Sequence, residues 1–509
     1  MDTRNSRNGG EMNLAQYLVA HAKATPERPA IRFEGETLTY GELARRARRF
    51  GAALAAAGIA PGDRVALYLP NIPEFPIAYY GIQAIGAVPV SINSIFKTEE
   101  VRYLLDDSGA RVVVTTAELI DFVPDDCAAL EQRLIAGPGE RPAGTAGLDD
   151  WIAGAGEAEL VKRAGDDPAA LLYSSGTTGF PKGVVLTQAN LHSNIASAAR
   201  YSGYRADDRL AGFLPLFHVY GQNYIMNACV LAGATLVLFR RFIPDVVLKA
   251  IADEKITMFF GVPTIFIGLL SLDLAGYDLA SLRYEMSAAA TMPEEISRRW
   301  HERFGRRIFE GYGLTECSPF ACYNDLEEHR FGSVGRAIEG FELAIFDEQD
   351  RPVAHGTWGE IVIRGPGVMQ GYWGKPEDTA LALRTGWLHS GDIGQTDEDG
   401  FVYIVDRVKD MINVSGFKVW PAEVEQYLYK IPGVQEVAVY GVPHPVKGEQ
   451  VAVAVVVKPG QKLTPDEVID YCNRNIASYK VPAQVKIVAE LPKSATGKIL
   501  KRVLRAQAE

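Results

Sequence analysis

A loop rich in glycine, serine and threonine carries the clearest chemical signal in this chain. It reads LYSSGTTGFPKG over residues 172–183 and follows an apolar stretch, 169–173, typical of a buried strand. Such a loop leaves backbone N–H groups and hydroxyls free to surround an anion, and Lys182 adds positive charge. A Walker A loop would need Gly-Lys-Ser/Thr, but here Pro181 stands five residues after Gly176. The loop therefore predicts a phosphate site that is not an ordinary P-loop.

The segment EGYGLTEC, residues 310–317, places an aromatic ring, a hydroxyl and a carboxylate close to two glycines. Tyr312 is suited to stack on a purine, and Thr315 to donate to a phosphate. Glu316 offers the oxygen ligands that a hard cation such as Mg²⁺ prefers. Taken alone, a tyrosine and a glutamate in a turn are more often structural.

Two later stretches offer a carboxylate and a cation. Asp392 ends an apolar segment among small residues, which suits it to accept hydrogen bonds from ribose hydroxyls, and Arg407 adds a donor. Alone, Asp392 would more often cap a turn. Lys498 lies in the loop PKSATGK near the C-terminus, where a lysine is usually just solvated. The four motifs together are far more specific than any one of them.

Composition limits the classes of function. The chain has 509 residues, enough for two or three domains, and its net charge of -11 disfavours a general nucleic-acid or acidic-membrane binder. Its five cysteines form no CxxC pair, which favours a reducing, cytoplasmic setting over a disulfide framework. The longest apolar stretch, 229–239, is shorter than the ~20 residues of a membrane-spanning helix. We expect no integral membrane segment, and disorder over polar residues 1–12.

Alternating helix and strand patterns over most of the length predict an α/β fold that positions these motifs. Thr39 and Glu42 form a capping box for a helix that ends before Pro61. Four arginines on that helix are expected to form its solvated face. Helix 99–105 is expected on the same grounds, and buried strands are predicted at 65–69, 111–115, 236–239 and 257–260.

The pattern changes after residue 400. A charged break, DRVKD over 406–410, predicts a hinge between a large domain, 1–405, and a small α+β domain, 411–509. In the small domain we expect helices beginning at Pro421 and after Thr464, a closing helix, and strands near 436–440, 450–457 and 484–488.

With its four motifs in this order, the chain resembles the adenylate-forming superfamily of acyl-CoA synthetases, luciferases and peptide-synthetase adenylation domains. The likeness extends from Thr39 to Lys498. It implies a large layered α/β N-terminal domain and a small mobile α+β C-terminal domain joined by a hinge. It also implies an acid:CoA ligase that uses ATP, Mg²⁺ and coenzyme A, forming acyl-AMP and pyrophosphate before CoA displaces AMP.

The resemblance also implies a role for each motif. The glycine-rich loop would hold the β- and γ-phosphates, while Lys498 would bridge the carboxylate and the α-phosphate. The small domain would then pivot at Lys409 to admit the pantetheine arm. Thr177 and Glu316 would hold the metal. The implied nucleotide- and CoA-binding residues are Ser174, Ser175, Gly176, Thr177, Thr178, Gly179, Lys182, Ser287, Ala288, Ala289, Gly311, Tyr312, Gly313, Thr315, Asp392, Arg407, Lys409, Ser415 and Gly416.

The acid pocket is expected around the FHVYG segment. His218 is a candidate catalytic gate or orienting group, although from the residues alone a hydrogen-bonded core histidine is equally consistent. Amino-acid adenylation domains place an aspartate after the corresponding aromatic residue, where this chain has Val219, so an amino acid is disfavoured. The tryptophan with which acetyl-CoA synthetases fill the tunnel is also missing, since Tyr312 is followed by Gly313. The expected wall is uncharged and consists of His218, Tyr220, Tyr224, Ala288, Ala290 and Phe320.

That wall favours a medium- or long-chain fatty acid, with an aromatic or dicarboxylic acid as the alternative. Ala288 replaces the usual glycine and its methyl group favours medium length, while Arg283 and Arg336 are the cations considered for a second carboxylate. Other activities stay open, namely carrier-protein loading and luciferase-like oxygenation. A non-catalytic acyl or nucleotide binder is disfavoured by the intact motifs. The expected partners are a small carboxylic acid, ATP and CoA, with no nucleic acid, in a monomer or homodimer.

Overall fold

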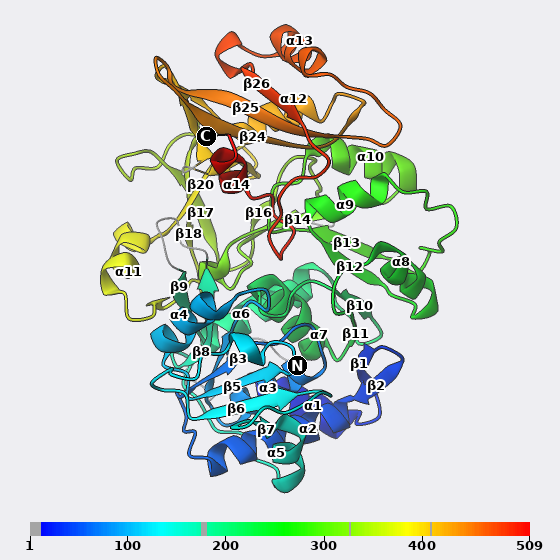
Figure 1. Cartoon of the computed structure of the whole chain (residues 1–509), viewed down its shortest axis with the longest axis vertical. Coiled ribbons are helices and arrows are strands. Elements are labelled where there is room, and N and C mark those ends of the chain that lie inside the picture. The colour runs from blue at the N-terminus through cyan, green and yellow to red at the C-terminus, as the bar shows by residue number, and fades with distance from the viewer. Residues whose placement is uncertain (1–11, 175–180, 325–326, 408–409, 509) are drawn as a thin grey trace.

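Four β-sheets with helices packed between and around them make up the chain (Figure 1). The computed structural model describes residues 12–174, 181–324, 327–407 and 410–508. In Figure 1 the C-terminal residues, orange to red, form the upper part, and the N-terminal sheets form the middle and lower parts. The predicted α/β class is confirmed.

The first large sheet has eight strands, and the predicted phosphate loop connects two of them. β8 and β9, which flank this loop in the sequence, pair antiparallel, so the chain continues from the loop into a strand rather than a helix. In sheet order the strands are β19 (Gly371–Tyr372), β9 (Lys182–Thr187), β8 (Pro168–Ser174), β4 (Val88–Ser91), β3 (Arg64–Leu67), β5 (Val112–Thr116), β6 (Gln132–Ala136) and β7 (Ala146–Gly147).

The second large sheet has nine strands, most of them parallel, so that their carboxyl ends meet at one edge. Such edges of parallel sheets are where α/β proteins commonly bind ligands. In sheet order its strands are β16 (Arg336–Ala337), β15 (Cys322–Tyr323), β14 (Phe309–Tyr312), β13 (Tyr284–Ser287), β12 (Met258–Gly261), β10 (Arg209–Gly212), β11 (Thr235–Leu238), β1 (Pro29–Phe33) and β2 (Glu36–Thr39).

Two smaller sheets follow in the sequence. The first holds β17 (Glu342–Phe346), β18 (Gly359–Arg364), β20 (Leu388–Thr396) and β21 (Val402–Arg407). The C-terminal sheet holds β23 (Phe417–Val419), β22 (Ile412–Val414), β25 (Gly448–Val457), β24 (Val434–His444) and β26 (Gln484–Ile487). The strands predicted after residue 430 all lie within this last sheet.

Helices cover the sheets and complete the core. The α-helices are α1 (Ala15–Ala24), α2 (Tyr40–Ala56), α3 (Glu74–Ala84), α4 (Thr98–Ser108), α5 (Leu148–Gly154), α6 (Gln188–Tyr201), α7 (Ala228–Ala232), α8 (Pro244–Asp253), α9 (Pro263–Leu270), α10 (Glu294–Phe304), α11 (Pro376–Ala382), α12 (Pro421–Leu428), α13 (Pro465–Asn475) and α14 (Lys501–Ala506). Shorter helical turns are η2 (Ile120–Phe122), η4 (Thr315–Cys317), η5 (Arg384–Gly386) and η7 (Ser478–Lys480), and η3 (Tyr220–Asn227) is a π-helix.

Local signals in the sequence explain several of these helices. Thr39 caps α2, because its hydroxyl oxygen accepts a hydrogen bond from the backbone N–H of Glu42 at 3.2 Å. Thr464 and Glu467 form the full capping box of α13, and α12 begins at Pro421 as predicted. The predicted helix over 99–105 lies within α4.

The arginines of α2 do more than form a solvated face, so that expectation is wrong for three of the four. Arg46 pairs with Asp149 at 2.9 Å, and Arg48 pairs with Glu157 at 2.7 Å. The side chain of Arg49 donates to the backbone oxygen of Ala155 at 2.7 Å. The side chain of Arg48 likewise donates to the backbone oxygen of Ala158. These bonds fasten the segment around α5 to α2, which the sequence pattern alone did not indicate.

The predicted hinge overlaps the last strand of the third sheet. Asp406 and Arg407 belong to β21, and Lys409 lies outside the described residues. The Asp406 carboxylate accepts a hydrogen bond from the backbone N–H of Ala422 at 2.7 Å, in the first turn of α12. The domain boundaries themselves stay a prediction.

Two other expectations concern the N-terminus and membranes. Disorder was expected to include Met12, but its backbone exchanges two hydrogen bonds with Arg163, and residues 1–11 lie outside the described part. Among the described residues, every helix is too short or too polar to cross a lipid bilayer. The five cysteines are buried as free thiols.

Candidate functional site

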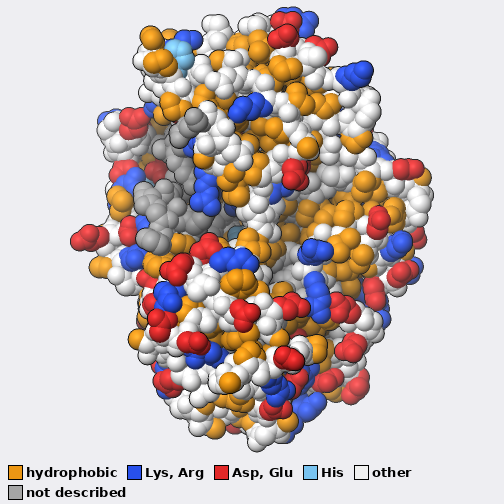
Figure 2. Space-filling model, in the orientation of Figure 1, with side chains coloured by type: hydrophobic (Ala, Val, Ile, Leu, Met, Phe, Trp, Pro, Cys, Tyr) orange, Lys and Arg blue, Asp and Glu red, His pale blue; other side chains and the backbone are white. Residues whose placement is uncertain are grey.

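The loop that carries Lys498 reaches from the C-terminal domain to the nine-stranded sheet, as the red segment between β26 and α14 shows (Figure 1). The Thr264 hydroxyl, in the first turn of α9, donates to the backbone oxygen of Gly497 at 3.1 Å. Gly497 has a φ of +78°, and a Cβ there would lie 2.8 Å from Val262. Glycine is thus required where the two domains touch. Figure 2 shows a hollow in this face where the domains meet.

His218 is under the electrostatic influence of Lys498. Burial, together with the positive charge of Lys498, lowers the pKa of His218 to about 3. The ring nitrogen Nδ1 faces the backbone N–H of Tyr220 at 3.3 Å, and it accepts that hydrogen bond when the proton resides on Nε2. The structure therefore places a neutral imidazole near the candidate catalytic lysine.

Asp392 and Arg407, the predicted ribose pair, are register partners on β20 and β21. Arg407 Nε lies 3.0 Å from one carboxylate oxygen of Asp392, and the Tyr312 hydroxyl donates to the other at 2.8 Å. The Asp392 carboxylate raises the pKa of Arg407, and burial raises that of Tyr312, so Arg407 is charged and Tyr312 keeps its proton. Two separate motifs thus meet at one carboxylate.

Glu316, the predicted metal ligand, is held in η4 beside the strand that leads into the phosphate loop. Its Oε1 accepts hydrogen bonds from the Ser174 hydroxyl and from the Tyr372 hydroxyl, both at 3.0 Å. Lys182 forms an ion pair with Asp378 of α11, and its ammonium lies 5.2 Å from the centre of the Tyr372 ring. Ser174, Lys182 and Glu316 therefore surround the two ends of the predicted phosphate loop.

Residues 175–180 lie outside the described part of the chain, and so does Lys409. The predictions for these positions, which include the second metal ligand, concern Ser175, Gly176, Thr177, Thr178, Gly179 and Lys409.

Ser287 is the last residue of β13. Beside it on β14 lies Glu310, which sequence reasoning missed. Ser287 pairs in register with Glu310, and both side chains are buried. Neither the Ser287 hydroxyl nor Glu310 Oε1 has a hydrogen-bond partner among the described residues. Burial raises the pKa of Glu310 well above its usual value, which favours the neutral carboxyl group. Buried polar atoms without partners require an explanation, and a bound ligand or water molecule is one.

The residues after Ser287 and Glu310 have backbone roles. Ala289 adopts the left-handed conformation with a φ of +71°, which turns the chain after β13. A Cβ on Gly313 would lie only 1.6 Å from the backbone oxygen of Pro319, and one on Gly311 would lie 2.6 Å from Met286. Close packing against backbone therefore requires glycine at 313, whereas the Met286 methyl group that faces Gly311 can shift. Thr315 begins η4, one residue before Glu316.

The predicted wall of the acid pocket is largely assembled. Tyr220 and Tyr224 lie in the π-helix η3, with ring centroids 5.6 Å apart, and Tyr224 packs edge-on to Phe320 at 5.0 Å. All three rings are buried. The Tyr224 hydroxyl pairs with Ser202, whereas the Tyr220 hydroxyl has no partner among the described residues. Ala288 is partly buried, but Ala290 is exposed, unlike the other members of the predicted wall.

Ser415 and Gly416, predicted to face CoA, form the exposed turn between β22 and β23. Both have left-handed backbones, with φ of +53° and +89°. The backbone N–H of Gly416 donates to the side chain of Asn413 at 2.9 Å, which stabilises the turn. The structure does not bring this turn together with the residues described above.

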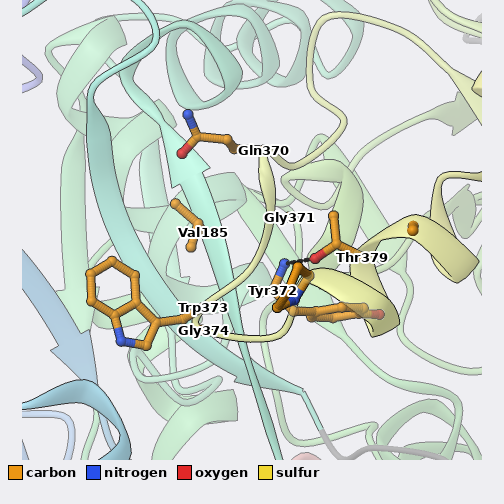
Figure 3. A pocket seen from close by; sticks show the side chains of 9 residues that line it. Val185, Gln370, Gly371, Tyr372, Trp373, Gly374 and Thr379 are labelled. Atoms are coloured by element: carbon orange, nitrogen blue, oxygen red, sulfur yellow. Dashed lines mark hydrogen bonds between the residues drawn. The ribbon is translucent and has the colours of Figure 1, made fainter.

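A separate hollow of about 380 Å³ lies between β9, β19 and α11 (Figure 3). Across it, the backbone N–H of Tyr372 donates to the Thr379 hydroxyl at 2.8 Å. Its lining carries no charged side chain and none of the predicted site residues, so we assign no chemistry to it. Its lining residues are Val185, Gln370, Gly371, Tyr372, Trp373, Gly374, Pro376, Thr379 and Ala380.

Sequence reasoning missed Glu310, Tyr372 and Asp378. Glu310 lies inside the EGYGLTEC motif, whose function was predicted from its other residues. The available signal was a second acidic residue in the same motif as Glu316. Tyr372 and Asp378 reach the site from a segment about 200 residues after the phosphate loop, and nothing in their local sequence marks them.

The chain is similar to known proteins over almost its whole length. The model of the AMP-binding enzyme family matches residues 18–373, and that of the AMP-binding enzyme C-terminal domain matches residues 423–498. A long-chain-fatty-acid–CoA ligase of Bacillus subtilis is 36% identical over 527 residues, covering 96% of this chain and 94% of the relative. A feruloyl-CoA synthase of Amycolatopsis is 37% identical over 496 residues, covering 97% and 98%. The crystal structure of an anthranilate CoA ligase with anthranoyl-AMP superposes with a TM-score of 0.92, at 29% identity and 98% coverage of both chains.

The low pKa of His218 predicts how stability depends on pH. Between pH 7 and pH 5 the unfolded chain, with a pKa near 6.5 at this ring, takes up a proton that the native state excludes. The free energy of unfolding therefore falls as the pH falls, by about 1 kcal/mol from this residue after allowance for partial exposure. Urea unfolding at both pH values should show a smaller fall for His218→Gln than for the wild type. His355→Gln, at an exposed ring, is the control, and equal falls for His218→Gln and the wild type would contradict the assignment.

Proposed function

This chain belongs to the AMP-binding enzyme family and is an AMP-forming acyl-CoA synthetase, and we propose that it joins a medium- or long-chain fatty acid to coenzyme A. The acid and ATP first give acyl-AMP and pyrophosphate, and the thiol of CoA then displaces AMP. The observation that carries this proposal is the docked loop, which brings Lys498 to His218 at the crevice between the domains.

The chemistry of the first step explains why a lysine is needed there. A carboxylate must attack a phosphorus atom that is surrounded by negative oxygens, so the barrier is largely electrostatic repulsion. A preorganised cation at the developing charge lowers such a barrier by several kcal/mol. An ammonium group carries three donors, enough to contact both the carboxylate and the α-phosphate. His218, neutral at physiological pH, adds no second positive charge that would repel Lys498.

The remaining residues would bind and orient the nucleotide. Asp392 would accept hydrogen bonds from the ribose hydroxyls, held in place by Tyr312 and Arg407. The unpaired oxygens of Ser287 and Glu310 would face the adenine. Mg²⁺, held by Glu316 with Thr177, would neutralise charge on the phosphate oxygens.

The second step would follow from a rotation of the small domain about the segment near Lys409. This rotation would withdraw Lys498 and present another face, which includes Ser415 and Gly416, to the pantetheine arm. The contact between Thr264 and Gly497 is then specific to the first step. A carrier protein in place of CoA is the alternative acceptor, and release of AMP that depends on free CoA separates the two.

The lining of the pocket favours an apolar monocarboxylic acid. Tyr220, Tyr224 and Phe320 present aromatic surface without charge. The two cations considered for a dicarboxylate are both committed elsewhere, since Arg283 pairs with the buried Asp208, and Arg336 pairs with Glu328 at 2.8 Å. A dicarboxylic acid is therefore disfavoured.

One observation favours a second candidate, a hydroxylated aromatic acid. The Tyr220 hydroxyl is buried without a partner among the described residues, and an alkyl chain would leave it so. Leaving a buried hydroxyl unpaired costs about 1–3 kcal/mol. A ring hydroxyl on the substrate would satisfy it. The feruloyl-CoA synthase relative is named for such an acid.

Loss of the Lys498 ammonium should separate the two half-reactions. We expect Lys498→Ala to lower the rate of acyl-AMP formation by about 10²- to 10³-fold, since it removes a cation aimed at the developing charge. Formation of acyl-CoA from preformed acyl-AMP and CoA should stay within about threefold of the wild type. The measurement is pyrophosphate release with ATP, Mg²⁺ and a panel of acids, with and without CoA. Lys486→Ala, an exposed lysine of the same domain, is the control.

Equal loss of both half-reactions would show that the role of Lys498 is misassigned. If the wild type never exchanges labelled pyrophosphate into ATP with any acid, the proposed function itself is wrong.

Removal of the Tyr220 hydroxyl should distinguish the two classes of acid. For a hydroxylated aromatic substrate, Tyr220→Phe removes the hydrogen-bond partner and should lower kcat/KM by about 10- to 100-fold. For a fatty acid, the same change should leave kcat/KM unchanged or raise it, because no buried hydroxyl has to be left unpaired. Tyr277→Phe is the control, since the Tyr277 hydroxyl of the wild type donates to the exposed Asp245. The acid whose kcat/KM responds identifies the class.

A further inference from the structure

Asp392 lies in a β-bulge of the sheet formed by β17, β18, β20 and β21. β18 and β20 pair through Glu360 with Ile393 and through Val362 with His389, so residues 390–392 all lie opposite Ile361. Gly391 has a φ of +70° within this bulge. Bulges occur next to active sites, where they redirect a side chain. This bulge is the immediate support of Asp392.

Side chains replace the sheet hydrogen bonds that the bulge interrupts. The Glu360 carboxylate accepts a hydrogen bond from the backbone N–H of Gly391 at 2.9 Å, and its other oxygen lies 2.7 Å from His389 Nδ1. The Ser390 hydroxyl donates to the backbone oxygen of Ile361 at 2.5 Å and accepts from the backbone N–H of Asp392 at 3.1 Å. Glu360 and Ser390 thus define the backbone on both sides of the bend.

The charge of Glu360 is balanced within the protein. Arg384 lies 3.2 Å from Glu360 and 2.9 Å from Asp350, and the His389 side chain is only 2% exposed. The Glu360, Asp350 and His389 ligand atoms lie within 4.8 Å of one another. The guanidinium group already supplies the positive charge that these carboxylates require, so this cluster is a structural support rather than a metal site.

We propose that Glu360 is a positioning residue for nucleotide recognition: its carboxylate fixes the 390–392 bulge and thereby aims Asp392 at the ribose hydroxyls. The inference rests on the proposed function, which makes Asp392 the ribose ligand. It is specific to one part of the nucleotide, because the strands that flank the phosphate loop belong to another sheet and Glu316 lies in η4, so neither belongs to the sheet that carries this bulge.

Removal of the Glu360 carboxylate should change ribose recognition selectively. Without it, the Gly391 N–H and the buried His389 ring lose their acceptor, the bulge relaxes, and Asp392 moves away from Tyr312 and Arg407. We expect Glu360→Ala to raise the KM for ATP about 10-fold, as loss of hydrogen bonds to a charged acceptor would, with kcat within about threefold of the wild type. Activation of an ATP analogue without ribose hydroxyls should change little.

The experiment compares kcat/KM for ATP and for 2′,3′-dideoxy-ATP. The wild type should prefer ATP by about 10- to 100-fold, because the analogue cannot donate to Asp392. In Glu360→Ala this preference should fall to within about threefold, and a mutation that only destabilises the fold would lower both values equally. Ser390→Ala, a smaller change in the same bulge, should also reduce the preference and replaces Glu360→Ala if that variant does not fold. Glu342→Ala, at an exposed ion pair of the same sheet, is the control and should keep the wild-type preference.

The outcomes separate the inference from its premise. A wild type without preference for ATP contradicts the ribose role of Asp392 and, with it, this inference. A wild-type preference that persists unchanged in Glu360→Ala, or in Ser390→Ala where the first does not fold, overturns the role of Glu360 alone. A preference lost in the bulge variants but kept in Glu342→Ala supports it.

Discussion

The repulsion between a carboxylate and a polyphosphate is the constraint on which this structure depends. Both reactants are anions, so the site must supply fixed positive charge at the point where they meet. The chain places one such charge, Lys498, on a loop of the small domain and holds that loop against the large domain through Thr264 and Gly497. The His218 ring, under the electrostatic influence of Lys498, is neutral at physiological pH. On the proposed function, the reaction centre exists only while the two domains are docked.

Around this centre, pairs of side chains from distant segments hold each binding group in place. Asp392 is oriented by Tyr312 and Arg407, and Glu316 by Ser174 and Tyr372. Each support comes from a different strand or turn, so the groups are aligned before substrates arrive. Such preorganisation lowers the cost of ordering them during the reaction.

The sequence predicted what depends on local pattern. It predicted the α/β class and the capping of α2 and α13 by Thr39 and Thr464, and it singled out Tyr312, Asp392 and Arg407, which are in contact in the fold. It did not predict contacts that depend on how remote segments pack. The salt bridges of Arg46 and Arg48 and the hydrogen bond from Tyr372 to Glu316 join segments that only the fold brings together, and the burial of the unpaired Glu310 Oε1 depends on the same packing. Ala290, predicted from its motif to line the acid pocket, is exposed, because its surroundings also depend on how remote segments pack.

The ion pair between Lys182 and Asp378 has a consequence for turnover. A triphosphate that engages Lys182 has to displace a carboxylate already in place, so only the difference between the two attractions contributes to its affinity. When pyrophosphate departs, the Asp378 carboxylate pairs with Lys182 again. An internal anion of this kind lowers the affinity for the phosphates and favours their release, which suits an enzyme that must release a highly charged product in every cycle.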